Sequence, residues 1–174
     1  MKKSLLAVAC GALLAAGCAG MQEQKEATAV AHLQPRSGSS VSGDVKFTQV
    51  GDVVRVTGEI KGHTKGPKGF HIHEKGDCSD DKGMNTGGHF NADKHKHGGP
   101  YDPAKHNGDL GNIVFDDKGV ARINFTVGDI SVSKDAANGI IGRAVIVHTA
   151  VDDLATDPTG NAGARVACGV IQAG

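Results

Sequence analysis

Aromatic residues and long amphipathic runs are scarce in this chain of 174 residues. Tryptophan is absent and aromatic side chains make up only 3% of the sequence, whereas glycine is abundant at 26 residues. The scarcity of long amphipathic runs argues against a helical bundle, and the composition favours many short strands joined by turns. The length is typical of one domain with a core of its own.

The chain also lacks net charge. Its 19 basic residues are balanced by 19 acidic ones, so the formal net charge is zero with histidine neutral. Proteins that bind nucleic acid through the phosphate backbone carry a basic excess, which this chain does not have. We therefore expect no nucleic-acid partner.

A long apolar run lies near the beginning of the chain. Met1-Lys2-Lys3 is positively charged, and residues 4–17 are apolar and small. This run is too short to span a bilayer and is built like a secretory signal. It ends in Leu-Ala-Ala-Gly-Cys18, a pattern typical of bacterial lipoprotein signals, in which the cysteine becomes the lipidated N-terminus. Ordinary signal cleavage nearby is the alternative.

These features predict the domain organisation. We expect a signal peptide at 1–17, which would remove Cys10, a tether at 18–28 and a single domain at 29–174. The expected location is exported and periplasmic, as a lipoprotein whose lipid anchor is its only attachment to the membrane.

Short alternating runs begin at residue 29. Val54, Val56 and Ile60, for example, alternate with polar residues, which is the pattern of a half-buried antiparallel strand. Regular strands separated by glycine- and aspartate-rich breaks predict an all-β sandwich or barrel. Two interruptions are long, at 74–110 and 150–164. The expected strands are 29–33, 41–47, 54–60, 70–73, 111–115, 121–127, 143–149 and 165–171.

Six of the nine histidines lie between residues 69 and 111. If 70–73 is a strand, His71 and His73 share one face, about 6.5 Å apart along the chain, and Phe70 and Ile72 point into the core. The rest of this stretch is too polar to order itself by burying apolar surface, but a metal ion can order such a loop. Exposed, unused histidines are the alternative for His71 and His73 taken alone.

The strand expected at 143–149 places a further histidine. His148 shares a face with Ala144 and Ile146, while Val145 and Val147 take the other face. If the valines face the core, His148 lies outside the barrel, beneath the loops. A small barrel fills its interior with side chains, so a metal site belongs there, on the outer face.

Six short motifs together resemble the copper/zinc superoxide dismutases over roughly residues 29–173. In chain order they are GFHIHE, GGHFN, KHGGP, HNGDLGN, GRAVIVHT and GNAGARVACGV. The resemblance implies an eight-stranded antiparallel Greek-key barrel, related to immunoglobulin-like sandwiches, with two long functional loops. It also implies copper and zinc as cofactors and superoxide as substrate.

The resemblance assigns the metal ligands by their place in the motifs. His89 would be shared, as an imidazolate that bridges the two metals and takes part in catalysis. His97 rather than His95 would bind zinc, because it directly precedes Gly-Gly-Pro. His95, His63 and His32 are expected to be exposed histidines without a role. The implied copper ligands are His71, His73, His89 and His148, and the implied zinc ligands are His89, His97, His106 and Asp109.

Further residues of the motifs receive roles from the same resemblance. Asp152 would link a copper histidine to a zinc histidine. Arg165 would be a catalytic residue that docks an anion beside copper. Cys78 and Cys168, the pair left after export and lipidation, would form a disulfide in an oxidising compartment, with two free buried thiols as the alternative.

The implied reaction is the dismutation of superoxide to dioxygen and hydrogen peroxide by copper that cycles between two oxidation states, protecting the cell envelope. A periplasmic copper-buffering lipoprotein is the competing hypothesis, but buffering requires neither a bridging histidine nor an anion dock. The sequence leaves open a monomer or a homodimer, and whether Lys65, Lys68 or Lys75 attracts the substrate.

Overall fold

The computed structural model describes residues 26–174, so the predictions for the signal peptide and Cys18 lie outside the described residues. All eight expected strands are present, most of them one to four residues longer than predicted. No helix within residues 26–174 is long and apolar enough to cross a membrane. The elements are β1 (Thr28–Pro35), β2 (Ser42–Val50), β3 (Val53–Lys61), β4 (Gly66–His73), the 3₁₀ turn η1 (Met84–Thr86), β5 (Asp109–Phe115), β6 (Val120–Val127), β7 (Ala144–His148) and β8 (Arg165–Ala173).

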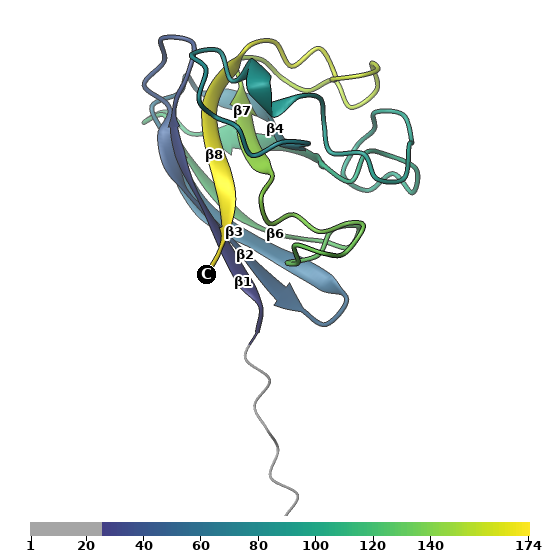
Figure 1. Cartoon of the computed structure of the whole chain (residues 1–174). Coiled ribbons are helices and arrows are strands. Elements are labelled where there is room, and N and C mark those ends of the chain that lie inside the picture. Colours follow the sequence, from purple (N-terminus) through teal and green to yellow (C-terminus); the bar gives the residue numbers. More distant parts are fainter. Residues whose placement is uncertain (1–25) are drawn as a thin grey trace, which may run out of the picture.

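The strands form one antiparallel sheet in the order β5-β4-β7-β8-β1-β2-β3-β6. Its two edge strands, β5 and β6, follow each other in the chain and are joined by a tight turn in which Gly119 donates to the Asp116 carbonyl. The sheet therefore curls into a nearly closed barrel (Figure 1). The predicted Greek-key fold is confirmed.

The core follows the predicted alternation of side chains. Phe47, Val56 and Ile60 are fully buried in the apolar core of the barrel. Phe70 and Val147, from neighbouring strands β4 and β7, belong to the same apolar cluster. The opposite face of β4 and β7 is therefore free to carry the histidines, as the side-chain parity predicts.

Two long loops cover that face. The first runs through residues 74–108 and the second through 149–164. Figure 1 shows the second loop and most of the first loop on the side of the molecule away from β2 and β3. The beginning of the first loop lies beside the end of β1, where the Ser37 N–H donates to the Asp81 carbonyl. The second loop is fixed at its start, where the Gly69 N–H donates to the Ala150 carbonyl at 2.9 Å.

A disulfide ties the first loop to β8. Cys78 and Cys168 are bonded with a Cα–Cα distance of 5.8 Å and lie 90 residues apart in the chain. Cys168 packs against Ala144 and Ile146 beneath the loops. Closing a loop of this length stabilises a protein by about 4–5 kcal/mol in the chain-entropy treatment. The predicted disulfide is confirmed.

Candidate metal centre

Four histidines converge under the two loops. His71 and His73 lie on β4 and His148 on β7, and all three are at most 2% exposed. His89 reaches them from the first loop, where it forms an isolated β-bridge with His73. We call these four residues the upper cluster; each offers one nitrogen within 4.8 Å of the others'.

Every histidine of the upper cluster has one buried nitrogen without a hydrogen-bond partner among residues 26–174. Nδ1 of His73 donates to the Gly87 carbonyl at 3.0 Å, and Nδ1 of His148 donates to the Gly163 carbonyl at 3.1 Å. Their Nε2 atoms, like Nδ1 of His71 and Nε2 of His89, are buried and make no hydrogen bond within the described part of the chain. Buried polar atoms are rarely left unpaired because this costs free energy, so these four nitrogens fit a metal ion.

A second group of ligand atoms surrounds one carboxylate oxygen. Oδ1 of Asp109 lies 2.7 Å from Nδ1 of His89, 3.1 Å from Nδ1 of His97 and 3.2 Å from Nδ1 of His106. We call these four residues the lower cluster. Three imidazoles and one carboxylate in a compact buried set suit a tetrahedral zinc ion. His89 belongs to both clusters, with Nδ1 toward the lower one.

Asp152 connects the two clusters from the second loop. Its Oδ2 accepts a hydrogen bond from Nε2 of His71 at 2.7 Å, and its Oδ1 accepts one from Nε2 of His97 at 2.8 Å. Asn112 on β5 holds the Asp152 backbone through two hydrogen bonds of 2.9 Å. Such a carboxylate orients imidazoles so that their other nitrogen faces the metal.

Burial sets the protonation of the three strand histidines, His71, His73 and His148. It lowers the pKa of His71 to about 4 and holds the pKa values of His73 and His148 well below the usual range. The three imidazoles are therefore neutral at neutral pH, which is the form that coordinates a metal.

The carboxylates dominate the electrostatics of the lower cluster. Burial disfavours the charged form of His97, but hydrogen bonds to Asp109 and Asp152 outweigh it and raise the His97 pKa to about 10. Burial opposes ionisation of Asp109 and Asp152 as well, yet hydrogen bonds from histidines lower both carboxyl pKa values. Without metal, His97 is thus a cation between two anions, and an ion bound here would displace its proton.

Two glycines make room for the Asp152 bridge. A Cβ at Gly160, which has φ +62°, would overlap Asp152 Oδ1 and lie 2.6 Å from His97 Nε2. A Cβ at Gly69 would lie 2.8 Å from the Cβ of Ala162 and 3.1 Å from Cε1 of His71. Both positions must remain glycine for the bridge to keep its geometry.

Arg165 lies beside the upper cluster, as predicted. It pairs with His148 across β7 and β8 at a bulge. Nη1 donates to the Gly83 carbonyl at 2.8 Å and to Oγ1 of Thr86 at 2.7 Å. Its positive charge contributes to the lowered pKa values of His73 and His148, after burial and the neighbouring histidines.

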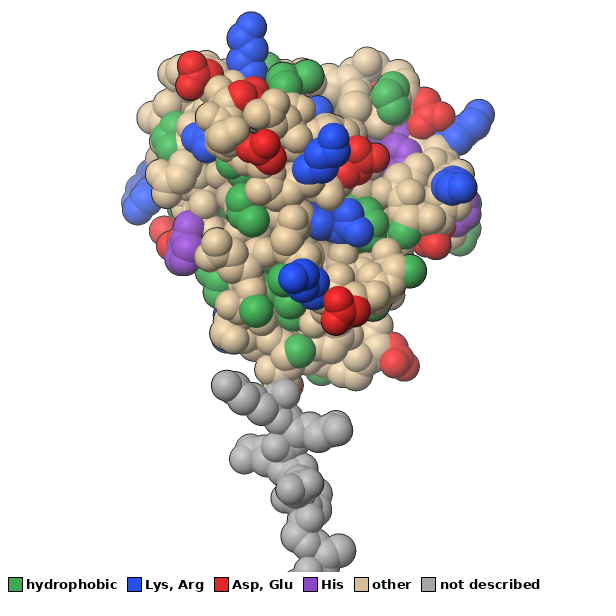
Figure 2. Space-filling model, in the orientation of Figure 1, with side chains coloured by type: hydrophobic (Ala, Val, Ile, Leu, Met, Phe, Trp, Pro, Cys, Tyr) green, Lys and Arg blue, Asp and Glu red, His purple; other side chains and the backbone are tan. Residues whose placement is uncertain are grey.

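The candidate lysines differ in what they contact. Lys65 forms an ion pair with Asp117 at 2.7 Å. Lys68 donates instead to the Thr149 carbonyl at 3.1 Å, and because a carbonyl is neutral this contact does not neutralise the lysine charge. Basic and acidic side chains are interspersed over the face shown in Figure 2. Of these two lysines, Lys68 is the better source of local positive charge, because its contact with the second loop does not neutralise it; Lys75, the third candidate, is exposed.

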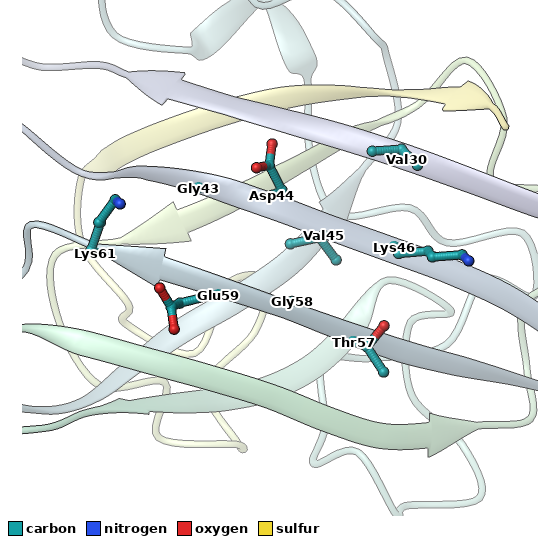
Figure 3. Close-up of a pocket in the computed structure, with 9 residues that line it drawn as sticks. All are labelled: Val30, Gly43, Asp44, Val45, Lys46, Thr57, Gly58, Glu59 and Lys61. Atoms are coloured by element: carbon teal, nitrogen blue, oxygen red, sulfur yellow. The ribbon is translucent and has the colours of Figure 1, made fainter.

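Three histidines stay outside both clusters. His32 and His95 are exposed, as expected. His63 was also expected to be an exposed residue without a role, but this is wrong: it is half-buried and its Nε2 donates to the His148 carbonyl at 3.2 Å. The hollow drawn in Figure 3 lies on β1, β2 and β3, and no residue of either cluster lines it.

The sequence did not single out several residues that support the site. Asn112 ends the HNGDLGN motif, which was its only signal. Asp157 accepts the His97 N–H at 2.6 Å from the second loop. Asp153 is exposed, and it accepts hydrogen bonds from Thr156 and Asn161 that organise the second loop.

Comparison with known proteins agrees with this geometry. The sequence model of the family described as Copper/zinc superoxide dismutase (SODC) matches residues 41–171. A superoxide dismutase [Cu-Zn] 2 from Brassica juncea is 44% identical over 142 residues, which cover 78% of this chain and 91% of the relative. The crystal structure of the clock protein EA4 superposes with a TM-score of 0.77 at 45% identity and covers 84% of this chain and 94% of its own. This chain therefore belongs to the copper/zinc superoxide dismutase family, whose members are oxidoreductases that dismute superoxide with copper and zinc.

Proposed function

We propose that the upper cluster holds copper and the lower cluster holds zinc. Copper would be bound by Nδ1 of His71 and by Nε2 of His73, His89 and His148. Zinc would be bound by Nδ1 of His89, His97 and His106 and by Oδ1 of Asp109. The observation that carries this assignment is the four buried, unpartnered nitrogens that converge in the upper cluster. When bound, copper supplies one-electron redox chemistry and zinc supplies a fixed positive charge.

The remaining chemistry belongs to the protein. Arg165 has a permanent positive charge. Within the described residues only Nη1 of its guanidinium donates hydrogen bonds, so Nε and Nη2 are available to a small anion such as superoxide. Formation of hydrogen peroxide requires protons. His89 can hold one at Nε2, which faces the upper cluster, while Nδ1 remains with the lower cluster. We therefore assign substrate docking to Arg165 and proton delivery to His89.

Removing one ligand from each cluster tests the assignment. We expect His73→Ala to lose copper and keep zinc, because His73 belongs only to the upper cluster, and His106→Ala to lose zinc and keep copper. Metal content after dialysis, measured together with superoxide consumption, checks both. His95→Ala is the control, since His95 is exposed and lies two residues from a proposed ligand. Equal loss of both metals from both variants would contradict the assignment to two separate sites.

We further propose that the enzyme is anchored in the cell envelope by a lipid on Cys18 and protects that compartment from superoxide. The support is the sequence pattern before Cys18 together with the disulfide, since disulfides persist in oxidising compartments. A diacylglycerol plus an amide-linked chain provides enough buried methylene for stable anchoring.

Cell fractionation tests the anchor. We expect the wild-type protein in the membrane fraction with Cys18 as its modified first residue, and Cys18→Ser in the soluble fraction or unprocessed. Ser4→Ala is the control, because it changes one side chain of the predicted signal and leaves the residues before Cys18 intact. Wild-type protein found wholly in the soluble fraction with another N-terminus would refute the proposal.

A further inference from the structure

The Arg165 guanidinium is held on one side by a short turn of the first loop. Nη1 donates to the Gly83 carbonyl at 2.8 Å and to Oγ1 of Thr86 at 2.7 Å. Thr86 is fully buried. A side-chain acceptor in this position fixes the guanidinium in two directions, which a single carbonyl would not do.

The hydroxyl of Thr86 has only one way to satisfy these contacts. Oγ1 lies 2.8 Å from the Gly83 carbonyl oxygen, which can only accept, so the hydroxyl donates its proton there. Its lone pair then accepts from Arg165. Thr86, Gly83 and Arg165 thus form a closed triangle of hydrogen bonds in which the direction of every bond is determined.

The turn that carries Thr86 is itself well fixed. The Asp80 carboxylate accepts the N–H groups of Met84 at 2.8 Å and Asn85 at 3.0 Å. The Thr86 carbonyl accepts the N–H of Lys75 at 3.0 Å. The next residue, Gly87, accepts from Nδ1 of His73. One turn therefore orients both Arg165 and a residue of the upper cluster.

We propose that Thr86 is a positioning residue for Arg165. Its hydroxyl holds Nη1 so that the opposite edge of the guanidinium, with Nη2 and Nε, faces the anion beside the upper cluster. The inference rests on the docking role proposed above for Arg165. The new element is that the first loop sets the orientation of the Arg165 guanidinium at the anion site, in addition to the charge that Arg165 supplies.

The test compares Thr86→Val, which keeps the shape and removes the acceptor, with Thr86→Ser, which keeps the hydroxyl. Thr57→Val removes the same atoms from the outer face of β3, in the hollow of Figure 3, and is the control. The first measurement is the nitrogen NMR spectrum of Arg165 in protein loaded with zinc alone. We expect resolved Nη signals in wild type, Thr86→Ser and Thr57→Val, and averaged signals in Thr86→Val because the guanidinium rotates freely.

The second measurement is made on protein loaded with both metals. Thr86→Val removes one of the two hydrogen bonds that hold Nη1 and leaves the charge of Arg165 in place. Azide binding and superoxide turnover should each fall by about three- to tenfold, the equivalent of one ordinary hydrogen bond. Thr86→Ser should stay within about twofold of wild type.

The outcomes separate the two proposals. Averaged Arg165 signals with weaker azide binding support the positioning role. Reduced thermal stability with unchanged signals and unchanged azide affinity would make Thr86 merely structural and overturn it. If Arg165→Ile itself leaves azide binding unchanged, the proposed dock is wrong whatever Thr86 does.

Discussion

Asp109→Ala is expected to abolish zinc binding and to lower the melting temperature of the protein by about 10 °C or more. Oδ1 of Asp109 is the point on which the three imidazoles of the lower cluster converge. Its Oδ2 also accepts the N–H groups of Gly98 at 3.0 Å and His106 at 3.1 Å. The change therefore removes a ligand and leaves two buried donors of the first loop unpaired, each costing about 1–3 kcal/mol.

Zinc content and thermal unfolding, recorded on the same samples, check this prediction. Asp117→Ala is the matched control, because the Asp117 side chain is 83% exposed and forms an ion pair with Lys65 at the surface. The control should shift the melting temperature by no more than about 2 °C, as exposed ion pairs contribute little. Full zinc occupancy in Asp109→Ala would show that the lower cluster is not the zinc site.

Arg165→Ile is expected to reduce superoxide turnover by about 10- to 100-fold while copper and zinc content stay as in wild type. The substrate is an anion, and Arg165 carries a charge that does not titrate in any usable pH range. The loss should stop near the upper end of that range because other cations, including Lys68, still attract the substrate.

Arg165→Lys should retain part of the activity, since it supplies charge without the planar fork. Azide inhibition should weaken in Arg165→Ile in parallel with turnover. The decisive measurements are metal stoichiometry, turnover and azide inhibition of each variant. Unchanged turnover with unchanged metal would make Arg165 an ordinary structural residue and move the anion site to the lysines.

The strands and the faces of His71, His73 and His148 followed from side-chain alternation. His71, Ile72 and His73 occupy the faces that the alternation predicted, because one face of β4 packs in the core. The membership of the two clusters came instead from the motifs. Spacing does not distinguish His95 from His97; the structure separates them, since His97 is buried against Asp109 and His95 is exposed.

The supporting contacts were beyond the reach of the sequence. Asn112 meets Asp152, and Thr86 meets Arg165, across long stretches of chain that only the folded sheet and loops bring together. His63 was misjudged for the same reason, because its partner is a backbone carbonyl on β7. A hydrogen bond to a backbone carbonyl cannot be predicted from residue type, because every residue carries the same carbonyl group.

The Asp152 bridge has a thermodynamic consequence. The carboxylate is shared by His71 and His97, so ordering one cluster lessens the conformational entropy that the other must still lose. By linkage, whatever factor an ion in the lower cluster changes the affinity of the upper cluster by, an ion in the upper cluster changes the affinity of the lower cluster by the same factor. The affinity for each metal therefore depends on whether the other site is occupied. A dissociation constant for either metal is defined only when the occupancy of the other site is stated.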